Sequence, residues 1–381
     1  MQLRIHQRLD EIPVEHWDRL RPDGNPFLSH AFLSGLETTG CIRNELGWQP
    51  WHLAWYRNHE LVAALPAYLK GNSHGEFVFD WSWAQAHELA GGRYYPKLLC
   101  AVPYTPVTGP RLLTGRRADS ALLQQALARS LISESRRLGL SGVHLNFPEA
   151  DDRGVLADDE RWLPRRDVQF HWHNAGYADF EQFLAALRHK KRKNIRAERQ
   201  QLHAAGWRFQ RLSGADLDES GWRFVHSLYV GTFAEKGNYP ALSEAFFQHL
   251  GRTLADQVMV CLARSPDGRP MAMALYLHDE RSLYGRYWGS LKAVPGLHFE
   301  CCYYQGIEFA IERGLQVFEP GAQGEHKMAR GFLPVLTHSF HHLTEPALQI
   351  KVMRWLEHER AAVDAWHDQL LARSPYAHAT G

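Results

Sequence analysis

Residues 318–332 read FEPGAQGEHKMARGF, and this stretch says more about the chain than any other. Pro320, Gly321 and Gly324 break regular structure, so we expect a loop here. The polar side chains of this loop are Glu325, His326, Lys327 and Arg330. A carboxylate, an imidazole and two cations on a glycine-shaped backbone are the parts of a polar site, although an ordinary surface turn would share this composition.

The bulk composition indicates a globular protein of two domains. At 381 residues the chain is too long for one typical hydrophobic core. Apolar residues make up 45% and charged residues 22%, as in an ordinary globular protein. Because 43 Lys and Arg face 42 Asp and Glu, the overall field is weak, and a nucleic acid or membrane would have to bind a local patch.

The sequence lacks signals for export or membrane insertion. Residues 1–10 are mixed polar, and no apolar run reaches about 18 residues. The cysteines are odd in number and form no Cys-x-x-Cys pair: Cys41, Cys100, Cys261, Cys301 and Cys302. This pattern favours reduced thiols over disulfides or a zinc site, with a nucleophilic role for the 301–302 pair as the alternative. We therefore expect a cytoplasmic protein without stable membrane insertion.

Apolar periodicity predicts an α/β fold with a mixed (α+β) sheet. The elements expected in the first half are strands at 51–56, 61–69 and 143–147 and a helix at 118–138. A strand at 168–173 leads into the second half. The helices expected there are at 179–205, 216–234, 243–254, 298–313 and 346–371. The strands expected there are at 207–212, 258–263, 271–278, 282–288, 315–319 and 335–342. The shared order of the halves predicts two related domains, 1–165 and 166–381, with the boundary between Leu163 and Asp179.

The densest positive run, residues 188–196, reads RHKKRKNIR. On a helix Arg188, Arg192 and Arg196 share a face, and Lys191 falls in the apolar stripe. A solvated charged face is the plain interpretation. The alternative is a cradle for phosphates, since arginine offers bidentate forks and lysine a point charge. A nucleotide, coenzyme A or tRNA would suit such a cradle.

Two further segments supply candidate site residues. Arg286 and Tyr287 end a strand, where ligands often bind in α/β folds, although Tyr287 could equally pack in the core. Glu300 begins a helix and is either a plain charge at the positive end of the helix dipole or a general base. Tyr303 follows it in the first turns.

Three histidines lie close together at the other end of the chain. On a strand His338 and His342 share one face, and His341 takes the other. Because no third ligand stands at a suitable spacing, we predict no metal site. The glycine-rich fingerprints of nucleotide and dinucleotide binding are also missing from the sequence.

Together these segments resemble the FemAB-like proteins of bacteria, which are labelled peptidoglycan biosynthesis or recognition proteins and placed in the GNAT acyltransferase superfamily. The segments that carry the resemblance are 187–198, 287–289, 298–300, 303–310 and 321–334. The block GAQGEHK at 321–327 is the most specific of them. The resemblance covers most of the chain.

The resemblance implies tandem GNAT-like domains, each a central mixed sheet flanked by helices, with the candidate site in the C-terminal domain. Fem transferases pass an aminoacyl group from charged tRNA to the amine of a cell-wall precursor peptide. The lysine of the terminal block matches Lys327. Two features of related transferases are missing: the Gln/Arg-x-x-Gly-x-Gly/Ala pyrophosphate loop after Ser282, through which the usual enzymes bind acetyl-CoA, and a long helical coiled-coil arm, through which tRNA could bind.

We therefore predict an acyl- or aminoacyltransferase that moves an acyl group from acyl-CoA or aminoacyl-tRNA to a small-molecule or peptide amine, with a cell-wall precursor as one such acceptor and no tightly bound cofactor. Glu300 or His326 would accept the amine proton, and Lys327 or Arg330 would stabilise the oxyanion. The predicted substrate-binding residues are Arg188, Lys191, Arg192, Arg196, Arg286, Tyr287, Tyr303, Gln323, Glu325 and Arg330. This hypothesis requires the turn and the basic helix to meet in space.

Two other functions stay open on the sequence alone. A non-catalytic module could use the same residues to recognise a nucleotide-linked or cell-wall ligand. An RNA-binding protein could use the basic helix, and its affinity would then fall steeply with salt. The oligomeric state is not fixed by any pattern in the sequence.

Overall fold

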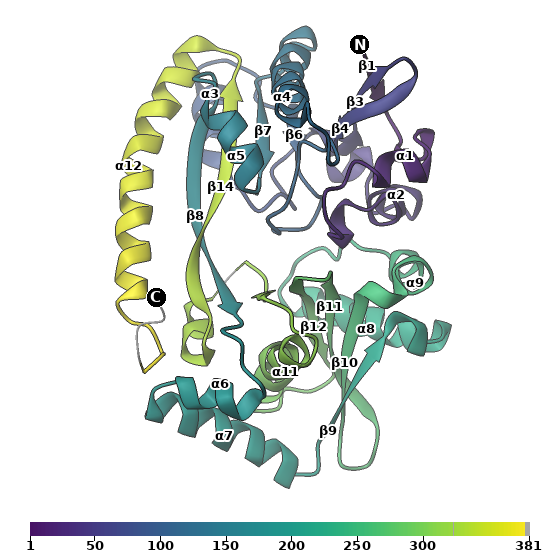
Figure 1. Ribbon diagram of the computed structural model, residues 1–381, viewed down its shortest axis with the longest axis vertical. Helices are drawn as coiled ribbons and strands as arrows, with labels where there is room; N and C mark the ends of the chain where they lie inside the picture. Colours follow the sequence, from purple (N-terminus) through teal and green to yellow (C-terminus); the bar gives the residue numbers. More distant parts are fainter. Residues whose placement is uncertain (323, 378–381) are drawn as a thin grey trace. The chain divides into compact units, whose positions relative to one another are not determined.

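The computed structural model describes residues 1–322 and 324–377 (Figure 1). Contacts divide the chain into two compact units: Met1–Val168 with Leu336–Trp366, and Gln169–Val335 with the residues from His367 onward. The first break falls inside the predicted boundary. However, the second unit is not continuous to the C-terminus as we expected, because a C-terminal segment belongs to the first unit.

Strand pairing and helix packing explain why that segment belongs to the first unit. Strand β14 pairs there with β7, and Phe340 stands opposite Leu145. The helix after β14 packs Leu348 and Val352 into a buried cluster with Trp83 and Tyr94. Pattern alone indicated the strand and the helix, but their partners lie roughly two hundred residues away in sequence, which periodicity does not reveal.

The strands of the first unit form a small sheet in the order β1-β3-β4 and a larger one in the order β2-β5-β6-β7-β14. The strands are β1 Gln2–His6, β2 Trp48–Pro50, β3 His52–Arg57, β4 Glu60–Leu65, β5 Ala67–Lys70, β6 Lys97–Cys100 and β7 Gly142–Asn146. The helices are α1 Val14–Asp18, α2 His30–Thr38, α3 Trp81–Leu89, α4 Ser120–Arg137 and α5 Ala150–Ala157. The strands expected at 51–56 and 61–69 pair as a hairpin of β3 and β4, and both of its turn residues, Asn58 and His59, have positive φ.

The core of the first unit lies between α4 and the sheet. Leu127 and Leu131 of α4 pack with Leu98 of β6 and Val143 of β7. The helix predicted at 118–138 is confirmed, although one leucine in its first turn, Leu122, is exposed. Two long elements link the units: β8 Leu163–His173 and β14 Leu333–Leu343 each begin in one unit and end in the other.

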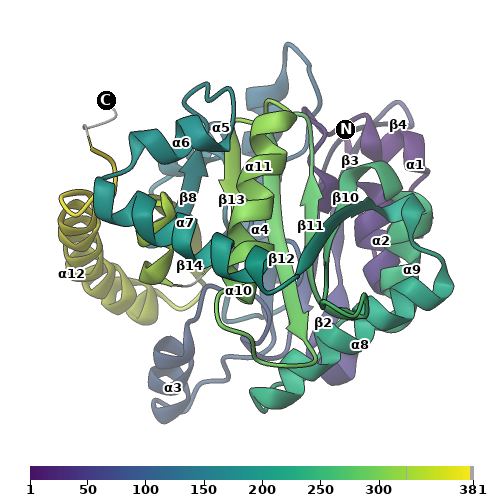
Figure 2. The same ribbon diagram turned by 90° about the horizontal axis from the view of Figure 1, so that it is seen from below.

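The sheet of the second unit has the order β8-β13-β12-β11-β10-β9. Its strands are β9 Arg208–Ser213, β10 Val258–Arg264, β11 Pro270–His278, β12 Ser282–Ser290 and β13 Val317–Glu319. Its helices are α6 Phe180–Ala186, α7 His189–Ala204, α8 Glu219–Glu235, α9 Glu244–Thr253, α10 Leu297–Phe299 and α11 Gln305–Glu312. The predicted meander is present as β10, β11 and β12. Strand β13 then pairs in parallel with β12 after a crossover through α11, which lies on the sheet face in Figure 2.

Two predicted helices are interrupted. The expected helix at 179–205 breaks into α6 and α7, because Leu187 is buried in an extended conformation and bridges to Tyr376. The expected helix at 298–313 contains a π-helical turn, Glu300–Tyr304, between α10 and α11. Such turns often occur at functional sites because they shift which side chains face inward. The terminal helix α12, Pro346–Leu371, has the predicted bounds.

Candidate active site

The glycine-rich stretch forms a short 3₁₀ turn, Glu325–Arg330 (η7), in the second unit. Two glycines bound the turn, and both have positive φ: Gly324 at 112° and Gly331 at 92°. At Gly331 an added Cβ would come within 2.8 Å of the Phe183 ring. The backbone conformation and the close packing therefore both require glycine at the end of the turn.

Lys327 of this turn is buried, with only 3% of its surface exposed. Its Nζ donates a hydrogen bond of 2.6 Å to the carbonyl oxygen of Gly321. Burial lowers the pKa of Lys327 to about 8, and the nearby Cys302 opposes this shift. Among the described contacts, the Lys327 ammonium has no carboxylate partner. It is therefore suited to interact with a negative charge that develops during a reaction.

The neighbouring His326 is paired with a tyrosine. Its Nε2 lies 3.0 Å from the hydroxyl of Tyr303, which belongs to the π-helical turn. Burial, and then the charges of Lys327 and Arg330, lower the pKa of His326 below its ordinary value of 6.5. The imidazole is therefore neutral at pH 7 and able to accept a proton. Burial also raises the pKa of Tyr303, which keeps its hydroxyl protonated.

Arg330 ties this turn to the basic helix. Its Nη2 donates to Glu198 Oε1 of α7 at 3.0 Å, and its Nη1 donates to the His326 carbonyl oxygen at 3.2 Å. Its guanidinium lies 3.3 Å from the centre of the Phe299 ring, and the Tyr304 hydroxyl donates to the other oxygen of Glu198. The turn and the basic helix therefore meet, as our hypothesis required.

Glu300 does not have the environment expected of a general base. Its side chain is fully buried, and Arg199 of α7 donates to both of its oxygens at 3.0 Å. Gln305 donates a further hydrogen bond of 2.8 Å to Oε1. With both oxygens engaged, the carboxylate of Glu300 anchors α7 to the π-helical turn, and this geometry disfavours proton transfer to it from a substrate.

The cations of the basic run lie around the first turns of α7. Arg188 donates through Nε to the Tyr376 carbonyl oxygen at 3.1 Å, and Arg192 through Nη1 to the Ala185 carbonyl oxygen at 3.3 Å. Arg196 pairs with Glu181. Lys191 is half-buried and its neighbours Lys190 and Lys193 are exposed. No side chain caps the N-terminus of α7, which leaves its backbone N–H groups and positive dipole end beside these cations.

The sequence pattern of the FemAB-like family, described as peptidoglycan biosynthesis/recognition, matches residues 8–378. The chain belongs to this family. No protein of curated function matches it in sequence.

Solved structures share the fold of this FemAB-like protein at low sequence identity. FemX is 12% identical, covers 93% of this chain and 100% of its own, and superposes with a TM-score of 0.53. L-PGS from Bacillus licheniformis is 13% identical, with coverage of 88% and 98% and a TM-score of 0.50. The C-terminal domain of a putative lysylphosphatidylglycerol synthetase from Agrobacterium fabrum is 11% identical, with coverage of 89% and 94% and a TM-score of 0.52. The family match gives the family of the chain, and the solved structures show that its overall fold is shared.

The other predicted site residues of the FemAB-like chain have partners of their own or lie outside the described residues. Tyr287 packs against Tyr229 of α8 at a ring distance of 4.8 Å, and Arg286 lies over the Tyr287 ring. This supports the core-packing alternative for Tyr287. Glu325 pairs with Arg373 at 3.0 Å. Gln323 lies outside the described residues.

Sequence reasoning missed several residues that hold the site together. Glu198 accepts hydrogen bonds from Arg330 and from the Tyr304 hydroxyl. Tyr376, which lies in the segment after α12, donates from its hydroxyl to the Gly331 carbonyl oxygen, and the two oxygens are 2.7 Å apart. Glu198 had one usable signal, because it is an acid in the middle of a strongly basic helix and so calls for a cationic partner. Tyr376 had no such signal in the sequence, because its contact with Gly331 forms only when the segment after α12 folds against the η7 turn.

The described residues show neither a metal site nor a helix that could cross a membrane. Within them, no three or more His, Cys, Asp or Glu side chains are grouped to hold a metal ion. His341 faces His144, with 2.7 Å between their Nδ1 atoms, while His342 Nδ1 lies 3.1 Å from the Arg161 carbonyl oxygen. In residues 1–322 and 324–377 no helix is long and apolar enough to span a bilayer.

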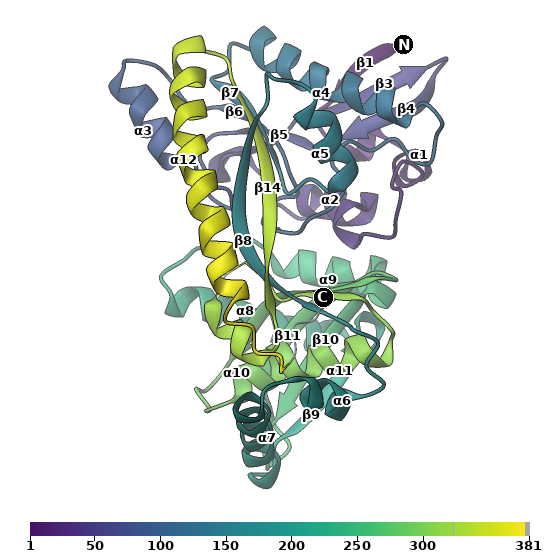
Figure 3. The same cartoon turned by 60° about the vertical axis from the view of Figure 1, so that its left-hand side comes forward.

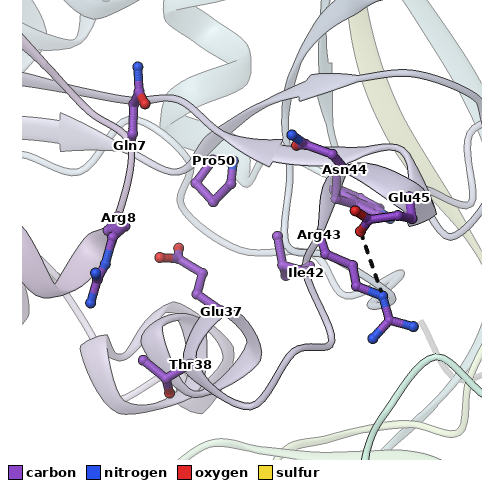
Figure 4. Close-up of a pocket in the computed structure, with 10 residues that line it drawn as sticks. Gln7, Arg8, Glu37, Thr38, Ile42, Arg43, Asn44, Glu45 and Pro50 are labelled. Carbon is purple, nitrogen blue, oxygen red and sulfur yellow. Dashed lines mark ion pairs between the residues drawn. The ribbon is translucent and has the colours of Figure 1, made fainter.

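A pocket of about 400 Å³ lies in the first unit of the FemAB-like chain (Figure 4). Glu37 of α2 is the central acid of this pocket, and Arg43 pairs with Glu45 at its edge. Both Glu37 oxygens are already engaged at 2.8 Å, one by His52 Nε2 and one by the Leu9 backbone N–H. Because its carboxylate is committed to the fold, we place the candidate chemistry at the η7 turn.

Proposed function

We propose that this FemAB-like protein is an aminoacyl- or acyltransferase that moves an acyl group from a phosphate-bearing donor to an amine, with a cell-wall precursor peptide as the acceptor. One observation carries the proposal. The η7 turn places the carboxylate-free, buried ammonium of Lys327 beside the neutral imidazole of His326, which is hydrogen-bonded to Tyr303. These groups match the two charges that acyl transfer to an amine creates.

The reaction steps assign a role to each group. The acceptor nitrogen attacks the carbonyl carbon of the donor ester or thioester, and His326 takes the proton that the nitrogen loses. The carbonyl oxygen becomes negative in the tetrahedral intermediate, and the Lys327 ammonium stabilises it. The intermediate collapses to an amide. The C–O or C–S bond of the donor breaks, and the leaving oxygen or sulfur receives the proton from His326.

The donor's phosphates are assigned to the first turn of α7. Residues 190–193 place four cations around the first turn of a helix whose N-terminus has no side-chain cap, so cations and free backbone N–H groups stand close together there. The Arg330–Glu198 ion pair fixes this helix against the catalytic turn. A phosphate bound at α7 would therefore lie in the same unit as the reacting carbonyl.

An aminoacyl donor is favoured over acyl-CoA on two grounds. The segment after β12, residues 289–296, has only Gly289 and Gly296 and lacks the Gly-rich pyrophosphate loop that binds coenzyme A in the usual acetyltransferases. In addition, one similar structure is titled a putative lysylphosphatidylglycerol synthetase, a name that contains a lysyl group. Both points support aminoacyl-tRNA as the donor.

A transfer assay tests the proposal directly. Purified protein is incubated with radiolabelled aminoacyl-tRNA or acyl-CoA and with a UDP-linked cell-wall pentapeptide, and the labelled amide is resolved chromatographically. We expect label in the peptide with wild type, loss of more than about 100-fold with Lys327→Met, and wild-type rates with Lys70→Met, a buried lysine of the first unit. Ligand-dependent thermal stabilisation with every donor inert would instead indicate a binding module.

A further inference from the structure

A cluster of exposed aromatic side chains lies on the first unit, on the loop before α3 and on α12. Phe77, Phe79, Trp81 and Trp355 expose 36%, 41%, 52% and 43% of their surfaces. The other exposed aromatic side chains among the described residues are Tyr239 and Trp366. At roughly 200 Å² per aromatic side chain, the four expose about 350 Å². Patches of this size on a monomer are often functional.

Contacts join Phe79, Trp81 and Trp355, and Phe77 stands two residues before Phe79 on the same loop; we call these four side chains the aromatic patch. The rings of Phe79 and Trp81 are stacked with centroids 4.5 Å apart. Arg165 donates to the Phe79 carbonyl oxygen at 2.7 Å and lies over the Trp355 ring at 5.4 Å. Figures 1 and 3 both show α3 beside the N-terminal part of α12. The patch is therefore continuous across the two elements.

The loop that carries the patch is held rigidly from beneath. Its residues alternate: Ser73, Glu76 and Asp80 are buried, whereas Phe77 and Phe79 point outward. The buried Lys97 amino group donates to Glu76 at 2.7 Å and also to Asp80 and Ser73. A three-way ion pair of this kind fixes the backbone, since breaking it would leave a buried charge unpaired.

The backbone conformation of the loop also indicates that its aromatic side chains are held on the surface. Phe77 has φ of +61°, a left-handed conformation that costs a bulky residue about 1–2 kcal/mol. A chain whose only need was to hide an apolar side chain would not keep phenylalanine in this conformation with a third of its surface in water. The ordered loop therefore holds its aromatic rings outward.

Two exposed cations of α12 flank the aromatic patch. On α12 the exposed side chains near Trp355 include Lys351 and Arg354, interspersed with Ile350 and Met353, each of which is also exposed. Two acids follow Trp355 on the same helix: Glu359 is paired with Arg165 at 2.8 Å, and Glu357 is exposed. Large aromatic rings with flanking lysine and arginine are the combination that inserts into the headgroup layer of a bilayer. Anionic headgroups complement the cations.

We propose that the aromatic patch is a peripheral membrane-binding surface, with Phe77, Phe79 and Trp81 entering the headgroup region of an anionic phospholipid bilayer. Lys351 and Arg354 then contact the lipid phosphates. Contact of this kind is interfacial and needs no spanning helix. The inference rests on the first unit alone and is independent of the proposed transferase chemistry.

Vesicle co-sedimentation with the full-length protein tests this surface. We expect binding to phosphatidylcholine vesicles that contain phosphatidylglycerol, weaker binding to pure phosphatidylcholine, and a fall with added salt. The triple variant Phe77→Ser, Phe79→Ser and Trp81→Ser should bind at least tenfold more weakly. The matched control is Leu122→Ser, which removes another exposed apolar side chain of the same unit, and it should bind like wild type.

Several outcomes would overturn the proposal. Wild type that stays in the supernatant with both vesicle types would do so, as would a triple variant that binds like wild type. If wild type is a dimer that does not bind vesicles and the triple variant is a monomer, the patch is a contact between two copies of the chain. If the triple variant fails to fold, as judged by circular dichroism, Trp81→Ser alone is used. The wild-type tryptophan fluorescence must then shift to the blue with anionic vesicles and not in the single variant.

Discussion

Replacing Lys327 by methionine should abolish transfer while stabilising the protein at pH 7. Methionine keeps the length and apolar stem of the side chain and removes only the charge. A fall in the lysine pKa from 10.5 to about 8 corresponds to about 3 kcal/mol by which burial disfavours the charged form. The lost hydrogen bond to the Gly321 carbonyl oxygen offsets about 1 kcal/mol of this. We therefore expect a net gain of about 2 kcal/mol in the free energy of unfolding.

The pH dependence of this gain gives a second check. Because the folded-state pKa lies below the unfolded one, the unfolded wild type binds more protons between pH 8 and 10.5. Stability from this group therefore rises with pH across that window. The advantage of Lys327→Met should shrink as the pH is raised from 7 to 10.5. Urea unfolding followed by tryptophan fluorescence, at both pH values, measures it.

Lys70→Met is the matched control. Lys70 is also fully buried, and burial lowers its pKa to about 7, but it belongs to the first unit and donates to Asn72. The Lys70→Met variant should therefore also have a higher free energy of unfolding at pH 7, and its transfer rate should equal that of wild type. The reasoning fails if Lys327→Met loses more than about 1 kcal/mol at pH 7, because the lysine would then be a structural residue.

Three further predictions follow from the same geometry. The pH profile of kcat/KM should be bell-shaped, with an acidic limb below 6.5 from His326 and an alkaline limb near 8 from Lys327; His326→Asn should remove the acidic limb and lower the rate by about 100-fold or more, and an unchanged limb would exclude this base. Glu300→Gln should lower stability by about 2 kcal/mol, since it removes the fully buried carboxylate that Arg199 contacts through two hydrogen bonds and leaves Arg199 only its ion pair with Glu308, while kcat of the folded fraction changes less than tenfold; a larger fall in kcat with intact stability would restore Glu300 as the base. Glu198→Gln should loosen Arg330 and raise KM for the donor, with Glu312→Gln as a control, since Glu312 pairs with Arg211 of β9 and neither is a predicted site residue; equal effects of both would contradict a special role for the Glu198 pair.

Most of the fold could be predicted because it depends on local pattern. Alternating and helical periodicity located the β3–β4 hairpin, the helix α4, the meander and the helix α12 within a few residues. The failures have tertiary causes. Leu187 leaves the helix because Tyr376 bridges to it, and residues 336–366 join the first unit because β14 pairs with β7. No local propensity encodes a partner so distant in sequence.

The site was predictable in composition and only partly in geometry. The glycines, the histidine and the two cations of residues 324–331 predicted a polar turn from the sequence, and the structure has the η7 turn there. The role of Glu300 could not be judged from sequence, because a carboxylate at a helix start looks the same whether water or an arginine faces it. Only the position of Arg199, 101 residues earlier in the chain, shows that the carboxylate is engaged.

The buried lysines of the protein show how the same residue type separates into structural and chemical roles. Lys97 is buried between Glu76 and Asp80, so its charge is compensated, and although burial alone would lower its pKa, the two carboxylates raise it. Lys327 is equally buried but bonds only to a backbone carbonyl among the described contacts, and burial lowers its pKa. An ammonium left without a counter-charge is costly to fold around, and it retains electrostatic capacity for a charge that arrives later. An oxyanion that forms only during reaction is such a charge, and a transition state therefore accounts for an environment that stability alone would not select.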